Sequence, residues 1–584
     1  MGGFFVYNKT KICNVDPALE LFDEMGFTSP KSIEIGEWHI YAFPKMVVEE
    51  PNIISGAGYT LVSAGTPIYK GHDYKSSLKS LLMDYMAGSI KYNQLIGQYT
   101  ILFCHENTIT ILMDSLGCKH LFMDKNHHML SSHMLPICQC YDGSIHINRK
   151  AFYEKLLTGI IMPPNTMFEE IIQIDKCIAT EIAGECIEFI QIPNFSECES
   201  HSKSEKQCLN DQIDTLRDYF LLLKNAGKDG IDIGLSGGYD SRLVLACLNR
   251  FNNNKIHLHS HSTEKVHQND LKIANQMADC IGTSCHTVPT KKLNHCEHVD
   301  EILRKSILYF DGRSSFSIGG CGEVYTASYR IESTEKTPLT MTGVGGELYR
   351  NVFDLGFNHI RFDRFIENKV FSQNSRNAIP QKEYTEIRND IIKRAAERLG
   401  INLGKRQPKT MAHRYYCEIM MPDGQGVALD AYNQVSCCIA PFLEPAIIAK
   451  GYEAVPFHHS GGEFEGKLIG LIDPGLASIP SSYGYPIGKR PLKAKIKEKL
   501  RTYIPYGIWD KLANVTHKNG TFSVDSALNE LYANSELLKE AYEYMNELFP
   551  EVQFIHLLHS SEEIRMVQFL AITLYLLKER IKVN

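Results

Sequence analysis

The sequence lacks several features that would assign it to a membrane or secreted class of protein. Its longest apolar stretch, residues 566–577, is interrupted by Gln568 and Thr573. It is shorter than the roughly 20 apolar residues that a membrane-spanning helix needs, so it predicts a buried C-terminal helix instead. The first residues, MGGFFVYNKTK, contain no apolar core of a secretion signal. We therefore expect a cytoplasmic protein with no membrane partner.

The sequence also lacks a large excess of positive charge and the cysteine motifs that bind zinc. The net charge is -7, without the basic excess that nucleic-acid-binding proteins use. The basic cluster at residues 489–501 has the spacing of a solvated helix face. The 17 cysteines form no pair of CxxC motifs, which would indicate zinc. We expect no nucleic-acid partner, and we expect the cysteines to be reduced, as is usual in the cytosol.

Residues 231–249, IDIGLSGGYDSRLVLACLN, form the most informative stretch that is present. An apolar run ends in Ser-Gly-Gly, and a helical pattern follows at once, which predicts a strand, a tight loop and a helix. Two adjacent glycines let the backbone approach a ligand closely, and the unpaired N–H groups at a helix start suit phosphate. On its own, the tripeptide also fits an ordinary strand-to-helix connection.

The polar residues of this loop complete a candidate phosphate site. Two serine hydroxyls can donate hydrogen bonds, and the Asp240 carboxylate can hold a magnesium ion that bridges two phosphates. The predicted nucleotide-binding residues are Leu235, Ser236, Gly237, Gly238, Asp240 and Ser241. The whole string SGGYDSR resembles the SGGxDS loop of the N-type ATP pyrophosphatases, which split ATP to AMP and pyrophosphate, and it lacks the lysine of a Walker loop.

The elements around this loop alternate between strand and helix. An amphipathic helix is predicted over residues 209–223, strands at 255–262 and 286–288, and a helix at 270–281. This alternation favours an α/β doubly wound parallel sheet, with ligands at the carboxyl ends of its strands. The segment KIHLHSHS places three histidines on one face of a strand. A metal site and a polar-lined strand end both fit, and the second is preferred because no carboxylate joins the histidines at helical spacing.

A second glycine-rich loop, in PLTMTGVGGELY at residues 338–349, repeats the strand-then-glycine pattern. Gly343 and Gly345 let the backbone approach phosphate, and Glu347 adds a second carboxylate. An exposed glycine-rich turn is the alternative. The segment resembles the SGEGADE loop of asparagine synthetases, with Glu347 where the pyrophosphate-side metal ligand is normally Asp. The resemblance implies that Asp240 and Glu347 together hold Mg²⁺ across ATP.

The strand-rich N-terminal part resembles the glutamine-hydrolysing domain of asparagine synthetases. MGGFF resembles its MCGIF opening, and further strings follow in the family's order: GQYTILF, MDSLGCKHLF, LSSH and NTMFEEIIQI. The resemblance implies an α+β, Ntn-hydrolase-like domain. In active members the residue after Met is a cysteine whose thiolate attacks the glutamine amide. Here that residue is Gly2, and Cys13, the nearest thiol, is interpreted as a small buried hydrophobe. We therefore predict that this domain does not hydrolyse glutamine.

Later segments continue the resemblance. APFLEPA (residues 440–446) resembles the family's RxPFLD string and EGKLIG (465–470) its GKxLL segment, and both are expected to be structural. HKNGTF resembles a KxGF motif whose lysine reaches the α-phosphate, which implies a catalytic role for Lys518, with Lys511 and Lys489 as alternatives. A surface lysine in a loop is the ordinary interpretation of each.

The resemblance implies two domains and an enzyme. Residues 1–195 are predicted to be an inactive class II glutamine-amidotransferase-like domain, residues 196–206 a linker, and residues 205–584 an asparagine-synthetase-like ATP-binding ligase domain. The implied reaction adenylates a substrate carboxylate with ATP and Mg²⁺, releases pyrophosphate, and captures the acyl-adenylate with an amine to release AMP. Glu347 and Lys518 are the predicted catalytic residues.

The incoming amine is the open part of this prediction. Val344 lies where asparagine synthetases carry Glu and β-lactam synthetases carry Tyr, so Gly2 and Val344 together disfavour ammonia derived from glutamine. We favour lactam or macrolactam formation in peptide natural-product biosynthesis, similar to lasso-peptide cyclases, with a precursor peptide and its leader-processing proteins as partners. Amidation of a small metabolite or sugar carboxylate with free ammonia is the close alternative. A nucleotide-binding pseudoenzyme that acts as an interaction module is the alternative outside enzymes. The oligomeric state is left open.

Overall fold

The computed structural model describes most of the chain. The described residues are 2–48, 51–175, 178–183, 186–191, 203–262, 268–293, 296–313, 324–334, 339–356, 358–482, 485, 487, 491, 496, 532, 535–558 and 560–582. Three predicted lysines, Lys489, Lys511 and Lys518, lie outside the described residues, as does most of the predicted linker.

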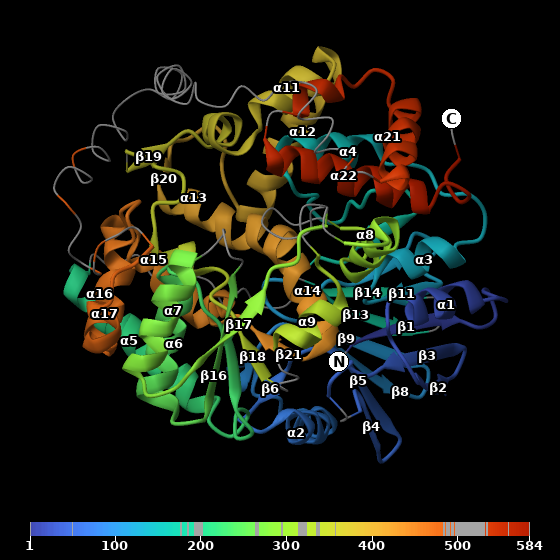
Figure 1. Ribbon diagram of the computed structural model, residues 1–584. Coiled ribbons are helices and arrows are strands. Elements are labelled where there is room, and N and C mark those ends of the chain that lie inside the picture. Colours follow the sequence, from blue (N-terminus) through green and yellow to red (C-terminus); the bar gives the residue numbers. More distant parts are fainter. Residues whose placement is uncertain are drawn as a thin grey trace.

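The chain before the predicted linker is called the N-terminal half below, and the chain after the linker is the second half. Two six-stranded antiparallel sheets form the N-terminal half, which agrees with the α+β prediction (Figure 1). The first has the order β12-β10-β11-β1-β3-β2, with β1 (Gly3–Asn8), β2 (Lys31–Ile35), β3 (Trp38–Phe43), β10 (Phe122–Asp124), β11 (Met129–Ser131) and β12 (Ile171–Gln173). The second has the order β14-β13-β9-β8-β5-β4, with β4 (Ile53–Gly56), β5 (Tyr59–Gly65), β8 (Tyr99–His105), β9 (Thr108–Met113), β13 (Ile178–Ala183) and β14 (Cys186–Gln191).

Alternation along β1 explains how these sheets pack. Side chains of successive strand residues point to opposite faces. Phe4 and Val6 enter a core shared with residues of β5 and β8, while Phe5 and Tyr7 pack on the other face, in a cluster with α1 (Asp16–Glu24) and α3 (Met134–Cys140). Helix α2 (Tyr74–Met86) packs against β5 from the opposite side. The N-terminal half is therefore a β-sandwich with helices on its outer faces.

A parallel sheet lies in the part of the chain after the predicted linker, as predicted. Its order is β17-β16-β15-β18-β21, and all neighbouring strands run parallel. The strands are β15 (Ile231–Gly234), β16 (Ile256–Ser262), β17 (Cys285–Pro289), β18 (Leu339–Met341) and β21 (Cys437–Ile439). The predicted helices are α5 (Glu205–Leu222), α6 (Asp240–Cys247) and α7 (Gln268–Cys280). Strand order reverses between β15 and β18, and open α/β sheets bind ligands at such a reversal.

Helices make up most of the remaining described chain. Their bounds are α4 (Arg149–Thr158), α8 (Val299–Tyr309), α9 (Ala327–Ser333), α10 (Phe362–Phe365), α11 (Gln373–Ala378), α12 (Gln381–Leu399), α13 (Thr410–Tyr415), α14 (Gly426–Val435), α15 (Pro445–Glu453), α16 (Glu463–Ile472), α17 (Pro474–Ser478), α21 (Glu536–Leu548) and α22 (Ser561–Leu576). In Figure 1, α6, α7, α16 and α17 gather on one side of the parallel sheet.

The C-terminal helices pack back onto the N-terminal half. The rings of Phe152, in α4, and Phe549, just after α21, stack with centroids 3.7 Å apart. The Lys582 N–H donates to the carbonyl of Ile145 at 2.9 Å. One hydrophobic cluster contains residues of both halves, including Phe5 and Phe569. The boundary at residues 195–205 stays a prediction, and the two halves share a continuous core across it.

Polar contacts also join the halves. The Gln98 side chain accepts from the Ala440 N–H at 2.9 Å and donates to the Ala440 carbonyl at 3.4 Å. The buried Lys45 ammonium donates to the backbone carbonyl of Asn433 at 2.5 Å. These contacts bring GQYTILF and APFLEPA, far apart in the sequence, to the same interface. They fit the expectation that APFLEPA is structural.

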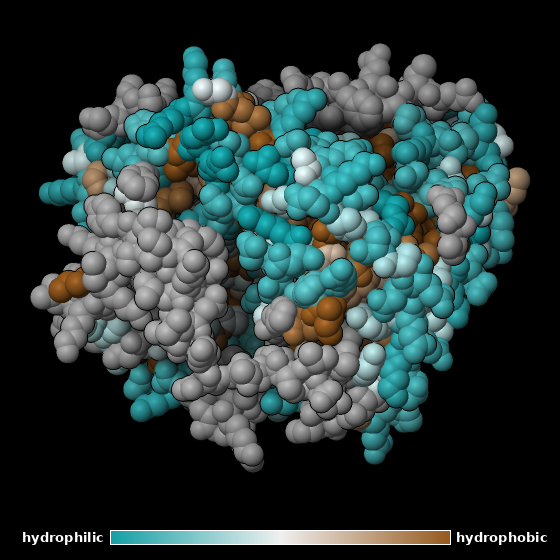
Figure 2. All heavy atoms as spheres, turned by 90° about the horizontal axis from the view of Figure 1, so that it is seen from above, coloured by the Kyte–Doolittle hydropathy of each residue, from teal (hydrophilic) through white to brown (hydrophobic). Residues whose placement is uncertain are grey.

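The described surface has no broad apolar band on the face shown in Figure 2. Among the residues coloured in this view, hydrophilic side chains dominate, and hydrophobic ones form small separate patches. Among the described helices, none combines the length and the apolar character required to cross a bilayer.

Candidate nucleotide-binding site

The two glycine loops predicted from sequence meet where the strand order of the parallel sheet reverses. One follows β15 and leads into α6, and the other follows β18 and leads into a 3-10 turn at Gly346–Tyr349. A Cβ added to Gly343 would lie 2.7 Å from the Ser241 nitrogen, and one on Gly346 would lie 2.3 Å from Asp240 Oδ1. Only glycine permits this approach. Asp240 and Ser241 are thus brought together with the second loop.

Gly345 has a different requirement for glycine. Its φ of +89° is a conformation that residues with a Cβ rarely adopt, and an added Cβ would lie 2.8 Å from Leu443 Cδ2. Leu443 comes directly before Glu444 of the APFLEPA segment. The second loop therefore packs against the APFLEPA segment, which also contacts the N-terminal half. Val344, between these glycines, is half-buried against the same core.

Two acidic side chains lie close together at the meeting point. Burial raises the pKa of Glu347, and the negative charge of Asp240 raises it further. The Tyr416 hydroxyl lies beside the Glu347 carboxyl and opposes part of this rise. A cation between the two carboxylates would relieve their repulsion, so the pair fits a divalent ion. In the described part of the chain, no group of three or more His, Cys, Asp or Glu side chains is arranged to hold a metal.

Arg350, which the sequence analysis did not single out, links two acidic residues at this site. Its NH2 group donates to Asp240 Oδ1 at 2.5 Å and to Glu465 Oε2 at 2.9 Å. Glu465, on α16, is fully buried, and burial, followed by the charge of Asp240, raises its pKa well above the usual range. EGKLIG therefore does more than pack: its glutamate is connected to the predicted metal ligand through one guanidinium. An Arg three residues after Glu347 was the available sequence signal.

The first loop pairs several of its backbone N–H groups within the protein, whereas the sequence analysis expects N–H groups free for phosphate. Gly237 N–H donates to Asp270 Oδ1 at 3.0 Å, and Gly238 N–H donates to Ser236 Oγ at 3.3 Å. Ser236 N–H donates to Ser241 Oγ at 3.3 Å. The amide of Leu235 donates to the His259 carbonyl at 2.7 Å and so belongs to the sheet. An incoming phosphate has to compete with Asp270 for Gly237.

Arg242, the last residue of SGGYDSR, anchors the loop from behind. Its side chain is fully buried, and burial lowers its pKa to about 10. It donates to the carbonyls of Leu476, Ile479 and Pro480 at the end of α17. Ser482 N–H then donates to the Gly237 carbonyl at 2.9 Å. The segment after α17 is thereby fixed against the loop, a structural role for which the arginine was the sequence signal.

Two histidines of the histidine-rich strand have polar partners within the protein. His259 Nδ1 lies 3.0 Å from Asp232 Oδ1, and His261 Nδ1 lies 3.0 Å from the Tyr329 hydroxyl. These pairs fit the preferred interpretation of a polar-lined strand.

Cys13 is exposed, so the interpretation of this residue as a buried hydrophobe is wrong. It follows a turn after β1 that turns its side chain away from the core.

The corner that would hold a nucleophilic cysteine in a glutaminase is filled. A Cβ on the buried Gly2 would lie 2.4 Å from Phe27 Cε1 and 2.5 Å from the Pro44 carbonyl oxygen. Phe22 stacks on Phe43 with ring centroids 4.1 Å apart, and His133 lies 5.3 Å from Phe27. The Phe27 ring and the Pro44 carbonyl thus occupy the space that a side chain at position 2 would enter.

Comparison with known proteins links part of this site to a family. The family model described as asparagine synthase matches residues 232–318, a segment that holds the first glycine loop but not the second. No curated protein matches the chain. The segment from β15 to beyond β17 is therefore similar to asparagine synthase.

Two solved structures show a distant likeness. A glutamine phosphoribosylpyrophosphate amidotransferase from B. subtilis, complexed with ADP and GMP, is 11% identical over 40% of this chain with a TM-score of 0.24, and the chain spans 61% of its length. An allosteric regulatory enzyme of purine biosynthesis is 10% identical over 46% of this chain and 67% of its own, also with a TM-score of 0.24. At this level the backbones correspond only loosely.

Proposed function

We propose that the protein is an ATP-dependent amide-forming ligase that releases AMP and pyrophosphate. The observation that carries this proposal is the convergence of two glycine loops and two carboxylates, Asp240 and Glu347, at the strand-order reversal. The match of residues 232–318 to asparagine synthase supports an ATP-using ligase in general.

The residues would divide the work as follows. Asp240 and Glu347 would hold Mg²⁺ together with phosphate oxygens of ATP, and the ion would draw charge away from the departing pyrophosphate. The hydroxyls of Ser236 and Ser241 would donate to the same phosphates. Arg350 orients Asp240 through a charge-assisted hydrogen bond. Lys518 is proposed to contact the α-phosphate.

The proposed chemistry has two steps. A substrate carboxylate attacks the α-phosphate of ATP, which forms an acyl-adenylate and releases pyrophosphate. An amine then attacks the acyl carbon, forms the amide and releases AMP. The filled corner around Gly2 supports an amine that does not come from glutamine hydrolysis in this chain. Within this class we favour lactam or macrolactam closure of a precursor peptide made available by leader-processing proteins, with free ammonia and a small metabolite or sugar carboxylate as the alternative.

One observation favours a second candidate, a nucleotide-binding module without catalysis. Gly237 N–H is held by Asp270, and Asp240 is held by Arg350, so both groups are already engaged by the protein. A site kept in this paired state would bind nucleotide weakly and would not turn it over.

Exchange of labelled pyrophosphate into ATP separates the two candidates. The ligase predicts exchange that depends on a carboxylate substrate and on Mg²⁺, tested with free amino acids, sugar acids and peptides. Asp240→Asn should reduce the exchange about 100-fold, because it removes a charge that meets the metal and Arg350. Asp270→Asn should retain exchange, and the exposed Asp279→Asn in α7 serves as a matched control. ATP binding without exchange for any carboxylate would support the module, and full exchange in Asp240→Asn would contradict the proposed metal site.

A further inference from the structure

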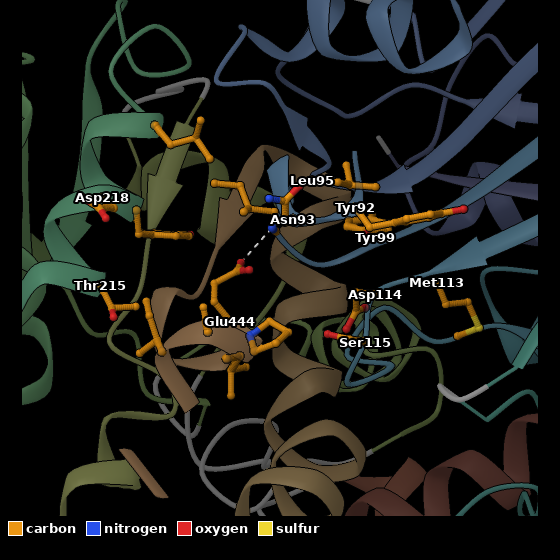
Figure 3. A pocket seen from close by; sticks show the side chains of 18 of the residues that line it. Tyr92, Asn93, Leu95, Tyr99, Met113, Asp114, Ser115, Thr215, Asp218 and Glu444 are labelled. Carbon is orange, nitrogen blue, oxygen red and sulfur yellow. Dashed lines mark hydrogen bonds between the residues drawn. The ribbon is translucent and has the colours of Figure 1, made fainter. Parts of the chain in front are cut away.

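A second cavity, separate from the glycine loops, lies between the two halves of the chain. Its volume is about 480 Å³, within the range of sites that bind small organic molecules. Residues of β8 and β9 line one side, and α5 and the start of α15 line the other. Figure 3 shows Glu444 in the middle, with Thr215 and Asp218 on one side and Asp114 and Ser115 on the other. Any molecule bound here would contact both halves.

The lining combines an apolar wall with carboxylates. Aromatic and aliphatic side chains supply most of it, including Tyr99, Leu112 and Ile447. Three carboxyl groups, Asp114, Asp218 and Glu444, also line it, and within the described chain none of its lining residues is Lys, Arg or His. An apolar cavity whose charged groups are all acidic suits a ligand with an apolar body and a positive group.

Glu444 is the group best placed to receive that charge. It is 5% exposed, and its Oε1 accepts from the Gly97 N–H at 2.8 Å and from the Gln98 side-chain amide at 3.5 Å. Both contacts use Oε1, so the carboxylate has accepting capacity left, and no cation pairs with Glu444 in the described residues. Asp114 is different, because its carboxylate caps a turn by accepting from the N–H groups of Cys118 and Lys119 at 3.0 and 2.9 Å.

Tyr219 provides a second polar group at the cavity. The residue is 7% exposed and lines the cavity from α5. Its hydroxyl is buried and makes no hydrogen bond of normal geometry to the described residues, although it lies close enough to Glu444 to lower that carboxyl's pKa. The hydroxyl oxygen would also accept a hydrogen bond from a ligand amine beside Glu444.

We propose that this cavity is a binding site for a small apolar amine, whose ammonium pairs with Glu444 and whose hydrocarbon body fills the wall formed by both halves of the chain. The site does not depend on the proposed ligase activity, because none of its lining residues belongs to the glycine loops. Leu443, which lines the cavity, also contacts Gly345, so the two sites lie back to back.

The proton balance of binding follows from the surroundings of Glu444. Burial raises the pKa of Glu444 to about 8 and the charge of Asp114 adds to this, while the Gly97 N–H and Tyr219 oppose it. Tyr99, which also faces the cavity, has its pKa raised well above the usual range and stays neutral. At pH 7 the carboxyl is mostly protonated before binding. Pairing with an ammonium ion ionises it, so its proton leaves to solvent.

Calorimetry with phenethylamine tests the proposal, with phenethyl alcohol as the matched neutral probe. The amine should bind the wild-type protein without ATP, at least about tenfold more tightly than the alcohol, because only the amine forms a charge-assisted bond in the buried site. Titration at pH 7 in two buffers of different ionisation enthalpy should show release of up to about one proton. Equal binding of amine and alcohol, absence of binding, or binding without proton release would each overturn it.

Two variants locate the site. Glu444→Gln keeps the side chain's size and should remove the preference for the amine and the proton release. Asp218→Asn, at the exposed rim, should keep both. If Glu444→Gln unfolds, Ala446→Trp, which fills the cavity from an exposed lining position, should abolish binding while the wild-type proton release still stands as evidence. Unchanged amine binding in Ala446→Trp would place the ligand elsewhere. None of these readouts uses ATP, so they fail or succeed separately from pyrophosphate exchange.

Discussion

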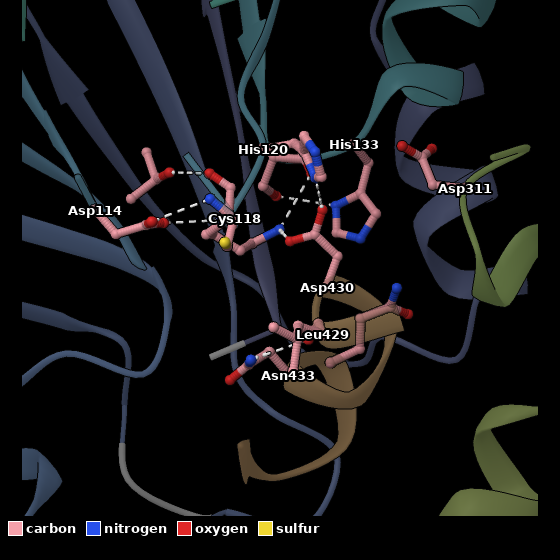
Figure 4. Close-up of polar contacts among 12 residues, drawn as sticks. Asp114, Cys118, His120, His133, Asp311, Leu429, Asp430 and Asn433 are labelled. Carbon is pink, nitrogen blue, oxygen red and sulfur yellow. Dashed lines mark hydrogen bonds and ion pairs between the residues drawn. The ribbon is translucent and has the colours of Figure 1, made fainter. Parts of the chain in front are cut away.

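The pKa values of buried carboxyl groups shift in opposite directions in two clusters of this protein. At the boundary between the halves, the carboxylate of Asp430, in α14, lies 2.8 Å from the Lys119 ammonium and 2.9 Å from the Arg313 guanidinium. The distance from Asp430 Oδ2 to His120 Nδ1 is 2.5 Å (Figure 4). Burial alone would raise the pKa of Asp430, but these cationic partners outweigh it and hold the pKa far below its usual range. Among the described residues, Asp430 therefore has two cationic partners within 3 Å, Lys119 and Arg313.

At the glycine loops, the described carboxyl groups outnumber the cations that pair with them. Among the described residues, Arg350 is the one cation that pairs with Asp240 and Glu465, and Glu347 lies nearby. The pKa values of Glu347 and Glu465 are raised, first by burial and then by Asp240. A buried carboxylate with too few cations marks a place where a cation or proton is still accepted, whereas a saturated one is structural. The difference in charge balance therefore distinguishes the candidate site from the interface.

The largest expected effect is on stability, from Asp430→Asn. The substitution leaves Lys119 buried without its anion and removes one of the two carboxylates that pair with Arg313, so the free energy of unfolding should fall by about 3–5 kcal/mol. Denaturant unfolding followed by circular dichroism measures it. Glu34→Gln, which removes the partner of Lys9 in an exposed ion pair, is the control and should leave the unfolding midpoint unchanged. Similar midpoints for the two variants would mean that the boundary cluster does not hold the halves together.

The next effect is on catalysis, from Gly346→Ala. The new Cβ would meet the Asp240 carboxylate at 2.3 Å and displace it from its position near Glu347. A shift of about 1 Å in a catalytic group costs on the order of 100-fold in rate, so pyrophosphate exchange should fall by about that factor. Gly470→Ala in α16, whose nearest neighbour would be Ala477 Cβ at 3.9 Å, should exchange normally. Equal rates would show that the second loop is not part of the site.

Local patterns in the sequence predicted most elements of the parallel sheet and the position of both glycine loops, but not the edge strand β21. Strand and helix periodicity depend on neighbouring residues, which is why β15, α6, β16, α7 and β17 occur close to the predicted ranges. The pairing of Arg350 with Glu465 and the cap of Asp270 on Gly237 could not be predicted, because they join residues 115 and 33 positions apart. Such contacts depend on how the chain folds back, which no local pattern encodes.

Position 2 shows a different limit of the sequence. The sequence shows that position 2 has no cysteine, but it does not show whether there is space for a side chain at that position. A Cβ at position 2 would meet Phe27, which follows α1, and Pro44, which follows β3, and only the folded chain brings these residues next to Gly2. The structure therefore adds a steric reason to the chemical one.

A smaller effect is expected from Gly2→Cys. The side chain would overlap Phe27 and the Pro44 carbonyl, and overpacking of this kind costs about 1–3 kcal/mol of unfolding free energy. The variant should also fail to release ammonia from glutamine, because the surrounding rings leave no room for the substrate amide. Gly56→Cys in β4 is the control, since nothing lies within 4 Å of its added Cβ. Measured glutaminase activity in Gly2→Cys would contradict the view that this corner is closed.

The most gradual effect concerns Glu444, which lies at the same boundary as Asp430 but has no cationic partner in the described part of the chain. Its pKa is raised by burial from an ordinary value of 4.5 to about 8, so the folded state binds its proton more tightly than the unfolded state does. The free energy of unfolding should therefore decrease as pH rises from about 4.5 to about 8, by up to about 1.4 kcal/mol per pH unit from this group. Glu444→Gln has no proton to lose, so the difference in stability between wild type and variant should follow this slope and then level off above pH 8. A difference that grows towards acidic pH in favour of the variant would have the opposite sign, and would mean that an unrecognised cation holds Glu444 ionised as Lys119 and Arg313 hold Asp430.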